Sequence, residues 1–326
     1  MKILVTGSSG FIGSHLTEFL TKKGYKITAF DRYNINNDYG WLEKSEFQKK
    51  INFVLGDLRD YDSVYKAMKG CDAVIHLAAL IGIPYSYNSP TAYIKTNVEG
   101  TFNILEAAKN LKLKQVIVTS TSEVYGTAKS KSLKESDPLS AQSPYAATKI
   151  AADQLSLSYF KSFNLPVKII RPFNTFGPRQ SLRAVIPTII SQFINKKNNI
   201  IKIGNLKTTR DFLYVEDLCS AYEKILKSKK LFGEVVNVGS NFEVSIDEII
   251  KKISRILKKK YKIASDKKRI RPEKSEVYRL RCDNRKMKKI TKWKPKYSFD
   301  QGLRNLIKWL SEDQNINKFK INKYNI

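Results

Sequence analysis

The fold of this chain is decided by its opening stretch, Lys2-Ile3-Leu4-Val5-Thr6-Gly7-Ser8-Ser9-Gly10-Phe11-Ile12-Gly13. An apolar run with the length of a buried parallel strand comes first, and a helical pattern follows the glycines at 11–23. Gly7 permits a tight turn, Gly10 lets the backbone approach a pyrophosphate, and Gly13 allows close packing of helix on strand. A strand, a glycine-rich turn and a helix in this order predict a dinucleotide-binding unit.

Outward from this unit, short apolar runs keep alternating with amphipathic stretches. Buried strands are expected at 26–30, 52–55, 73–76, 115–119 and 167–170, and helices at 61–68, 96–110 and 145–163. This alternation predicts an α/β fold with a doubly wound parallel sheet, whose ligands lie at the carboxyl ends of the strands.

After Arg171 prolines and glycines interrupt the pattern. We expect helices at 187–195, 215–227 and 245–259 and strands at 200–203 and 235–238, with Ser245 capping the last helix and Glu248 at its third position. The chain should therefore form a nucleotide-binding domain over 1–171 and a smaller substrate-binding domain over 172–326, with some later segments returning to the main sheet.

The charge of the chain is strongly positive. The formal net charge is +29, and residues 251–326 hold 26 Lys and Arg against 7 Asp and Glu. A basic tail can bind polyanions, but no nucleic-acid module accompanies it, so we favour lysines on solvated helix faces. No signal-peptide pattern, no apolar run as long as a membrane span and no cysteine framework is visible. We expect a cytoplasmic protein with no metal site and with neither nucleic acid nor membrane as a partner.

The cofactor site has further candidates beyond the three glycines. Asp31 ends the second strand, where a carboxylate can accept from adenosine ribose hydroxyls and repel a 2′-phosphate, whereas the neighbouring Arg32 leaves room for a phosphorylated cofactor. We expect NAD in preference to NADP. The other cofactor-binding candidates follow the first, third and fourth strands or lie on the next helix: Phe11, Ile12, Asp57, Leu58, Leu77, Ala78, Ala79 and Asn97.

Two segments carry the chemistry, Thr121-Ser122-Glu123-Val124-Tyr125-Gly126 and Ser143-Pro144-Tyr145-Ala146-Ala147-Thr148-Lys149. The Tyr-x-x-x-Lys spacing puts a phenol and an ammonium one turn apart on one helix face. The cation then favours the phenolate and lowers the pKa of Tyr145 towards a value useful for proton transfer. Glu123 suggests an acid/base step beyond hydride transfer.

These residues resemble the extended short-chain dehydrogenase/reductase superfamily, specifically its sugar-nucleotide epimerase and dehydratase branch. The resemblance covers nearly the whole chain and rests on the glycine turn, the two catalytic segments, His76-Leu77-Ala78-Ala79, Asn97-Val98-x-Gly100-Thr101, Arg171-Pro172-Phe173-Asn174-Thr175-Phe176-Gly177-Pro178 and Thr209-Arg210-Asp211-Phe212-x-Tyr214-Val215-x-Asp217. Finer features at 78–87, 179–187 and 271–277 resemble the NAD-dependent 4,6-dehydratases that act on nucleotide-linked N-acetylglucosamine at the start of legionaminic acid biosynthesis. The resemblance implies a Rossmann-type sheet, NAD as cofactor, and a homodimer formed through the helices at 96–110 and 145–163.

By this resemblance, the substrate is UDP- or GDP-N-acetylglucosamine and the product its 4-keto-6-deoxy derivative. Tyr145, helped by Lys149, takes the proton of the sugar 4-hydroxyl beside the cofactor, Thr121 donates to the C4 oxygen, and Glu123 removes the C5 proton. Many sugar-nucleotide dehydratases have Asp-Glu where this chain has Ser122-Glu123, so either Glu123 or Ser122 with a water protonates the departing hydroxyl. The residues expected at the diphosphate and the base are Asn174, Arg183, Ala184, Val185, Arg210, Arg271 and Glu273.

Other functions stay open. The same scaffold hosts 4-epimerases, which generally lack the glutamate, and UDP-glucuronate decarboxylases, which carry a similar Thr-Ser-Glu-Val-Tyr-Gly string but usually differ around the catalytic tyrosine. A non-catalytic dinucleotide sensor or RNA-binding protein would fit the basic C-terminal region, but the complete set of Glu123, Tyr145 and Lys149 argues against it. Arg183 can equally be a surface charge.

Overall fold

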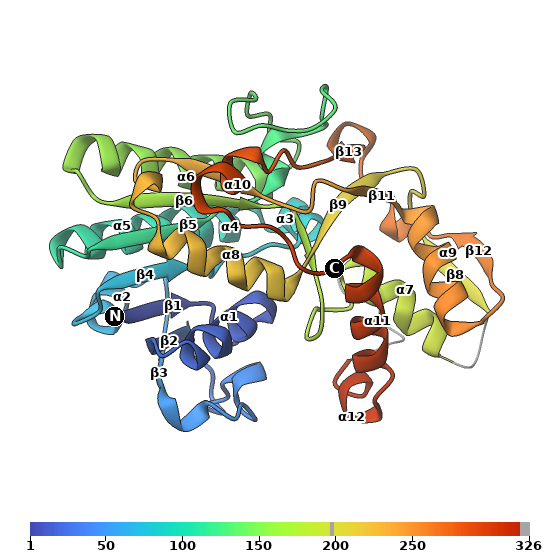
Figure 1. The fold of residues 1–326 in the computed structure, drawn as a ribbon, viewed down its shortest axis with the longest axis horizontal. Helices are drawn as coiled ribbons and strands as arrows, with labels where there is room; N and C mark the ends of the chain where they lie inside the picture. Colours follow the sequence, from blue (N-terminus) through green and yellow to red (C-terminus); the bar gives the residue numbers. More distant parts are fainter. Residues whose placement is uncertain (196–198, 320–326) are drawn as a thin grey trace.

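The computed structural model describes residues 1–195 and 199–319, and Figure 1 shows a sheet-centred lobe beside a smaller lobe rich in helices. The larger lobe is built on a seven-stranded sheet in the order β10-β6-β5-β4-β1-β2-β3, in which all neighbouring strands are parallel. Its strands are β1 (Lys2–Thr6), β2 (Lys26–Arg32), β3 (Ile51–Gly56), β4 (Ala73–His76), β5 (Gln115–Thr119), β6 (Val167–Pro172) and β10 (Val235–Val238). The predicted doubly wound parallel sheet is confirmed.

Alternate residues of β1 feed two separate cores. Ile3 and Val5 point to one face of the sheet and Leu4 to the other, as the two-residue period of a strand requires. Helices cover both faces, which explains why the strands have continuous apolar sequences. The helices on the first face are α1 (Phe11–Lys22) and α8 (Val215–Lys227), and those on the second are α2 (Tyr61–Met68), α5 (Gly100–Asn110) and α6 (Pro144–Phe163).

The segment after β4 differs from the single helix expected at 96–110. It contains α3 (Ile83–Asn88) and α4 (Pro90–Tyr93), followed by a π-helical turn at Ile94–Glu99 that leads into α5. Turns of this kind are rare in proteins overall, and those that occur are often at functional sites. Here the turn carries Asn97, one of the predicted cofactor residues.

The smaller lobe is organised around β9 (Thr209–Tyr214), which the sequence pattern did not predict. This strand pairs with β7 (Asn174–Phe176), β11 (Glu243–Ser245) and β13 (Arg279–Leu280). The remaining elements of the lobe are the parallel pair β8 (Ile200–Ile203) and β12 (Lys262–Ser265) and the helices α7 (Val185–Ile194), α9 (Ile246–Leu257), α11 (Phe299–Leu310) and α12 (Asp313–Ile316). Ser245 and Glu248 form the predicted capping box at the start of α9.

Segments from the second half of the chain also complete the larger lobe. β10 pairs with β6, placing Val235 opposite Ile169, and α8 packs against α1 (Figure 1). Met287 of α10 (Arg285–Thr291) is buried in the same core as Ile3 and Val5. The two lobes are therefore connected by several crossings of the chain.

A buried aspartate fixes the position of β9. Asp211 accepts hydrogen bonds from the N–H groups of Ser240 (2.8 Å), Asn241 (2.8 Å) and Cys282 (3.1 Å) and from the Ser240 hydroxyl (2.6 Å). These bonds join β9 to the loops that follow β10 and β13. They hold the neighbouring Arg210 at the junction of the two lobes.

No helix within the described ranges combines the length and the apolar character that a bilayer span requires. Among the same residues, no three His, Cys, Asp or Glu side chains gather as a metal site would require.

Candidate active site

The glycine turn leaves no room for side chains at two of its three positions. Gly7 has φ +70°, and a Cβ built on it would lie 2.9 Å from Ala78 Cα. A Cβ on Gly13 would lie 2.0 Å from the Gly7 carbonyl oxygen, whereas one on Gly10 would meet only that oxygen, at 3.3 Å, among the described atoms. The space in front of Gly10 is thus open at the start of α1, where a pyrophosphate binds in dinucleotide folds, so these residues fit NAD.

Asp31 lies beside this turn at the end of β2. Its Oδ2 accepts from the Ser8 hydroxyl (3.0 Å) and from the Ser9 N–H (2.5 Å), while its Oδ1 meets only the Arg32 N–H at 3.3 Å. The carboxylate is therefore oriented by the turn and keeps capacity to accept from a ribose hydroxyl. Arg32 itself is exposed.

Several of the other predicted cofactor residues lie around the glycine turn or hold its neighbouring segments in place. The N–H groups of Leu77 and Ala78 both donate to Thr6 Oγ1 (3.2 Å each), which holds the short Ala78-Ala79 segment against the turn. Phe11 and Ile12 are half-buried at the start of α1. Leu58 is buried beneath Gly100, and a Cβ on that glycine would lie 3.1 Å from it.

Asn97 and Asp57 already have protein partners. Asn97 accepts from the Leu80 N–H (2.8 Å) and donates to the Leu80 carbonyl (2.9 Å) and to Thr148 Oγ1 (3.1 Å). It clamps the loop after β4 onto α6. Asp57 pairs with Arg59 at 2.5 Å, and the hydrogen bond from that guanidinium lowers the pKa of the Asp57 carboxyl.

Two capped segments bring the predicted catalytic side chains together. Ser143 caps α6 by accepting from the Ala146 N–H (3.1 Å), which fixes the first turn that carries Tyr145. Thr121 caps the 3₁₀ turn Ser122–Tyr125 by accepting from the Glu123 N–H (3.2 Å). We call Ser122–Tyr125 the catalytic turn because it carries Glu123, the predicted second base. Because this turn follows β5, the predicted catalytic residues lie at the carboxyl end of a strand of the sheet, where ligands of doubly wound folds bind.

The electrostatics of Tyr145 differ from the expectation based on spacing. Burial raises the pKa of Tyr145, a hydrogen bond with the Thr121 hydroxyl lowers it, and the Glu123 charge raises it. The expected lowering by Lys149 is therefore wrong for the protein alone. Burial in turn lowers the pKa of Lys149 to about 8, against a raising effect of Asp153.

A buried ion pair stands behind Lys149. Asp153, one turn further along α6, pairs with Arg171 of β6 at 2.9 Å, and neither side chain is more than 3% exposed. Arg171 also donates to the Tyr125 hydroxyl (2.8 Å), at the end of the catalytic turn. These contacts from Asp153 through Arg171 to Tyr125 join α6, β6 and the turn into one rigid unit, as a preorganised site requires.

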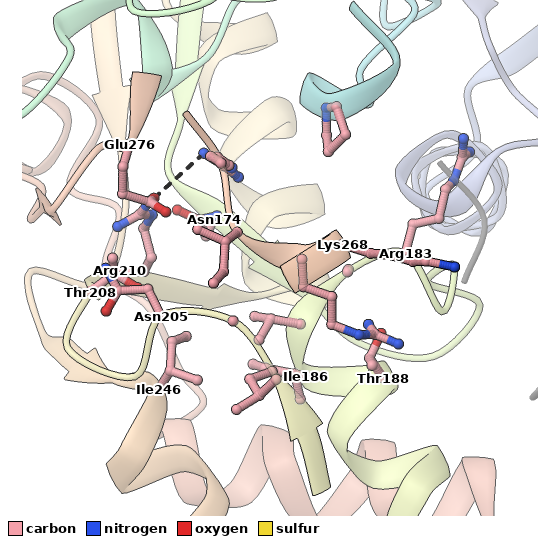
Figure 2. Close-up of a pocket in the computed structure, with 18 of the residues that line it drawn as sticks. Asn174, Arg183, Ile186, Thr188, Asn205, Thr208, Arg210, Ile246, Lys268 and Glu276 are labelled. Carbon is pink, nitrogen blue, oxygen red and sulfur yellow. Dashed lines mark ion pairs between the residues drawn. The ribbon is translucent and has the colours of Figure 1, made fainter. Parts of the chain in front are cut away.

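A pocket of about 420 Å³ opens beside Arg210 and Glu276 (Figure 2). Arg210 reaches it from β9 and Arg271 from the loop before β13, and both make ion pairs with Glu276, at 3.7 and 4.0 Å. Glu273 is exposed and does not line the pocket. The other six predicted substrate residues line it: Asn174, Arg183, Ala184, Val185, Arg210 and Arg271.

Glu123 connects the catalytic turn with this pocket. Burial lowers the pKa of Arg210, and the Glu123 charge raises it. The same carboxylate acts on Tyr145. Glu123 therefore lies within electrostatic reach of both the Tyr145 phenol and the pocket residue Arg210.

Some pocket residues were missed from the sequence. Asn174 Oδ1 and Gln180 Oε1 are buried without hydrogen-bond partners among the residues described, although buried polar atoms are nearly always paired. Two such atoms in one pocket indicate a polar ligand. Gln180 and Glu276 were missed although both stand in strings that resemble the sugar-nucleotide enzymes, and that position was the available signal.

A protein-family model described as GDP-mannose 4,6 dehydratase matches residues 4–306. The chain belongs to this family. The match confirms the predicted place within the sugar-nucleotide branch of the extended short-chain dehydrogenases/reductases, whose members include dehydratases, epimerases and decarboxylases.

Individual relatives show how broad the family is. A dTDP-D-glucose 4,6-dehydratase of Dictyostelium discoideum is 38% identical over 275 residues, which are 78% of this chain and 62% of that protein. A UDP-N-acetyl-alpha-D-glucosaminuronate decarboxylase of Bacillus cytotoxicus is 33% identical, over 96% of this chain and 99% of the relative. The UDP-glucuronic acid 4-epimerase of Bacillus cereus, solved with UDP-glucuronic acid and NAD, is 31% identical with a TM-score of 0.86, covering 95% of this chain and 99% of that chain. The Rossmann-type fold is thus confirmed, and family membership alone does not select the reaction.

Proposed function

We propose that the protein is an NAD-dependent 4,6-dehydratase that converts UDP- or GDP-N-acetylglucosamine to the 4-keto-6-deoxy sugar nucleotide. The observation that carries the proposal is the position of Glu123, whose charge acts on both Tyr145 and Arg210. A 4,6-dehydration needs a second base beside the tyrosine, because a proton must leave C5 after C4 has been oxidised. A simple 4-epimerisation needs no such group.

The first half of the reaction uses the α6 residues. Tyr145 takes the proton of the sugar 4-hydroxyl while Thr121 donates to the C4 oxygen, and the Lys149 ammonium offsets the phenolate charge. Gly7, Gly10 and Gly13 would hold the pyrophosphate of NAD, and Asp31 its ribose. Bound NAD supplies hydride acceptance from C4 and hydride return to C6.

The second half belongs to the catalytic turn. The new 4-keto group acidifies the C5 proton, which Glu123 removes. The C6 hydroxyl then leaves as water, with the proton that Glu123 has taken or with one relayed through the buried Ser122. Once C6 has regained a hydride, a proton from solvent adds to C5 and Tyr145 releases the 4-hydroxyl proton to solvent, so the reaction is a net loss of water without net oxidation.

The substrate assignment rests on the pocket and on the sequence resemblance. Arg210, Arg271 and Asn174 would bind the diphosphate, with Arg183 nearby and Ala184 and Val185 beside the base. The N-acetylated sugar is supported by the resemblance of 78–87, 179–187 and 271–277 to dehydratases of legionaminic acid biosynthesis. The name of the Bacillus cytotoxicus relative also contains an N-acetylated sugar nucleotide.

The test is incubation with UDP- and GDP-N-acetylglucosamine in heavy water, followed by mass spectrometry and NMR. Loss of water with solvent deuterium at C5 supports the proposal and identifies the nucleotide. We expect Glu123→Gln to keep oxidation at C4, seen as NADH absorbance, and to lose dehydration, whereas Tyr145→Phe should lose both. A C4 epimer of unchanged mass, or carbon dioxide released from UDP-glucuronate without dehydration of either hexosamine, would replace the dehydratase by one of the two related activities.

We further propose that the enzyme is a cytoplasmic homodimer formed through α5 and α6. Phe102 of α5 and Phe163 of α6 are 42% and 53% exposed, and both contact the Tyr159 ring, so these helices present an aromatic strip to solvent. Three free cysteines fit the reducing compartment. Phe102→Glu should convert the dimer to a monomer in light scattering; a wild-type protein with the mass of one chain would contradict this proposal.

A further inference from the structure

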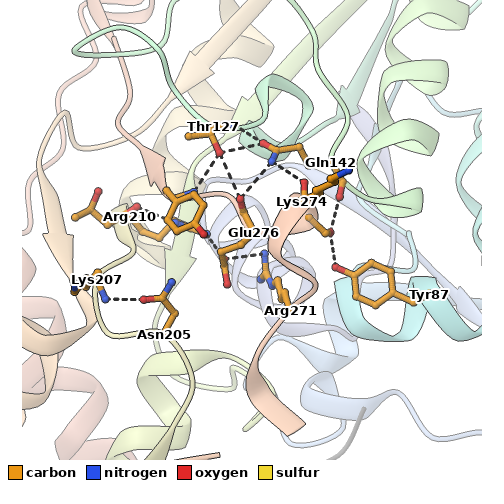
Figure 3. Close-up of polar contacts among 12 residues, drawn as sticks. Tyr87, Thr127, Gln142, Asn205, Lys207, Arg210, Arg271, Lys274 and Glu276 are labelled. Atoms are coloured by element: carbon orange, nitrogen blue, oxygen red, sulfur yellow. Dashed lines mark hydrogen bonds and ion pairs between the residues drawn. The ribbon is translucent and has the colours of Figure 1, made fainter. Parts of the chain in front are cut away.

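One side chain outside the catalytic and substrate-binding sets contacts three functional segments. Gln142 immediately precedes Ser143, the cap of the helix that carries Tyr145, and Figure 3 shows its amide between Thr127 and the loop that contains Lys274 and Glu276. An amide is suited to this place because it offers a donor and an acceptor on one planar group.

The acceptor half of the amide holds the catalytic turn. Gln142 Oε1 accepts from the Thr127 N–H at 2.6 Å and from its hydroxyl at 3.1 Å. Thr127 follows Gly126, whose φ is +65° and where a Cβ would lie 2.7 Å from Gln142 Oε1. The glycine is therefore needed for this close approach at the exit of the turn that carries Glu123.

The donor half of the amide holds the loop at 271–276, which we call the diphosphate loop because Arg271 is proposed to bind the diphosphate. Gln142 Nε2 donates to the carbonyl oxygens of Lys274 (3.1 Å) and Glu276 (3.3 Å). The Ser275 hydroxyl donates to the Gln142 carbonyl (2.5 Å) and accepts from the hydroxyl of Tyr87, a pocket residue, at 2.6 Å. The same loop begins with Arg271 and ends with Glu276. A ligand that binds these two residues therefore acts on the backbone carbonyls to which Gln142 is hydrogen-bonded.

We propose that Gln142 is a positioning residue that transmits occupation of the diphosphate pocket to the start of α6 and to the catalytic turn. The inference rests on the proposed binding of a nucleoside diphosphate at Arg210 and Arg271. A ligand that orders the 271–276 loop would thereby order the segments that carry Tyr145 and Glu123. Binding at the nucleotide end of the substrate would then prepare the groups that act on its sugar.

The informative variant is Gln142→Glu, which has nearly the same shape. A carboxylate still accepts from Thr127 but cannot donate to the two carbonyls, so the change breaks the two side-chain bonds to the 271–276 loop. The bond from the Ser275 hydroxyl to the Gln142 carbonyl and the contact of the Thr127 hydroxyl with the Glu276 carbonyl (3.5 Å) remain. Gln142→Ala removes the side-chain bonds to Thr127 as well as those to the loop, and it leaves the same two remaining contacts. Gln192→Glu is the matched control, because Gln192 bridges the Lys202 N–H (2.7 Å) and carbonyl (3.1 Å) in the same two-sided way outside the pocket.

The experiment is hydrogen–deuterium exchange of the NAD-loaded protein with and without UDP or GDP. In the wild-type and control proteins, nucleotide should slow amide exchange both at 268–276 and at 124–147. In Gln142→Glu the protection at 268–276 should remain, and that at 124–147 should fall below the wild-type value, with a remainder carried by the Ser275 and Thr127 contacts. Three results would overturn the proposal. The first is protection at 124–147 in Gln142→Glu equal to that in the wild type. The others are protection of the wild type at 268–276 alone and failure of both nucleotides to bind.

Kinetics separate this inference from the proposed reaction. On the substrate that the wild type turns over, Gln142→Glu should lower kcat by about tenfold or more while the nucleotide dissociation constant changes by less than about tenfold. A variant that weakens binding and leaves kcat unchanged would contradict positioning. If neither hexosamine is dehydrated but the exchange pattern is as expected, the dehydratase proposal fails and the role of Gln142 stands.

Discussion

Two alanine substitutions, three residues apart in the glycine turn, should separate cofactor binding from folding. The Cβ of Gly13→Ala would lie 2.0 Å from the Gly7 carbonyl oxygen, well inside the usual carbon–oxygen contact of about 3.3 Å. The turn or α1 must therefore move by roughly 1 Å, and overpacking of this kind costs about 3 kcal/mol. For a chain of this length we expect the Tm to fall by about 6 °C.

Gly10→Ala should behave in the opposite way. Its Cβ would meet only the Gly7 oxygen, at 3.3 Å, and Gly10 already has φ −72°, which any residue adopts, so the Tm should stay within about 1 °C of wild type. The new methyl group would instead fill the space where the pyrophosphate binds. We expect NAD affinity to fall at least about 100-fold, equivalent to about 2.7 kcal/mol.

Differential scanning fluorimetry and NAD titration calorimetry on both variants provide the measurements. The reasoning is refuted if Gly10→Ala binds NAD as tightly as wild type, or if Gly13→Ala melts at the wild-type temperature.

Three further changes test the electrostatics and the contact between lobes. Because burial lowers the pKa of Lys149 from 10.5 to about 8, kcat/KM should fall as pH rises through about 8, by about tenfold per unit above it; a profile flat to pH 10 would contradict this. Glu276→Gln removes the carboxylate that pairs with Arg210 and Arg271, so inorganic pyrophosphate should bind about threefold to tenfold tighter in calorimetry, and unchanged affinity would exclude the competition. Trp41→Leu removes an edge contact with Trp309 (centroids 5.6 Å apart) and should cost about 1 kcal/mol in urea unfolding, a loss absent if the two rings contribute nothing.

The parallel sheet was predictable because its strands are buried on both faces. β1, β4, β5 and β10 have the predicted bounds, since a mainly apolar run is visible without knowledge of the partner strand. β9 was missed because two charged residues, Arg210 and Asp211, interrupt its apolar pattern. Both side chains are buried: Arg210 faces the pocket, and Asp211 accepts four hydrogen bonds from distant loops. Such a strand is specified by tertiary partners that its own sequence does not reveal.

The site shows the same division. Spacing predicted that Tyr145 and Lys149 share a helix face, but the sign of the pKa shift of Tyr145 depends on burial and on the nearby Glu123, which only the fold determines. At the diphosphate loop, resemblance selected Glu273, whereas the structure places Glu276 in the pocket three residues later. Glu273 begins a 3₁₀ turn, Glu273–Ser275, and Glu276 follows it, so this turn decides which carboxylate faces the pocket.

The late pairing of β10 has a consequence for synthesis of the chain. β6 ends at Pro172, but its outer neighbour is completed only at Val238, so 66 further residues must be made before that edge is covered. At translation rates of about 5 to 20 residues per second, the delay is roughly 3 to 13 s. During that interval the nascent sheet presents an uncovered apolar edge strand, the kind of surface that pairs with other chains. Ribosome-bound chains in which β6 has emerged and β10 has not should therefore be the ones that holdase chaperones retain longest, and pausing of the ribosome within that window should lower the yield of folded protein.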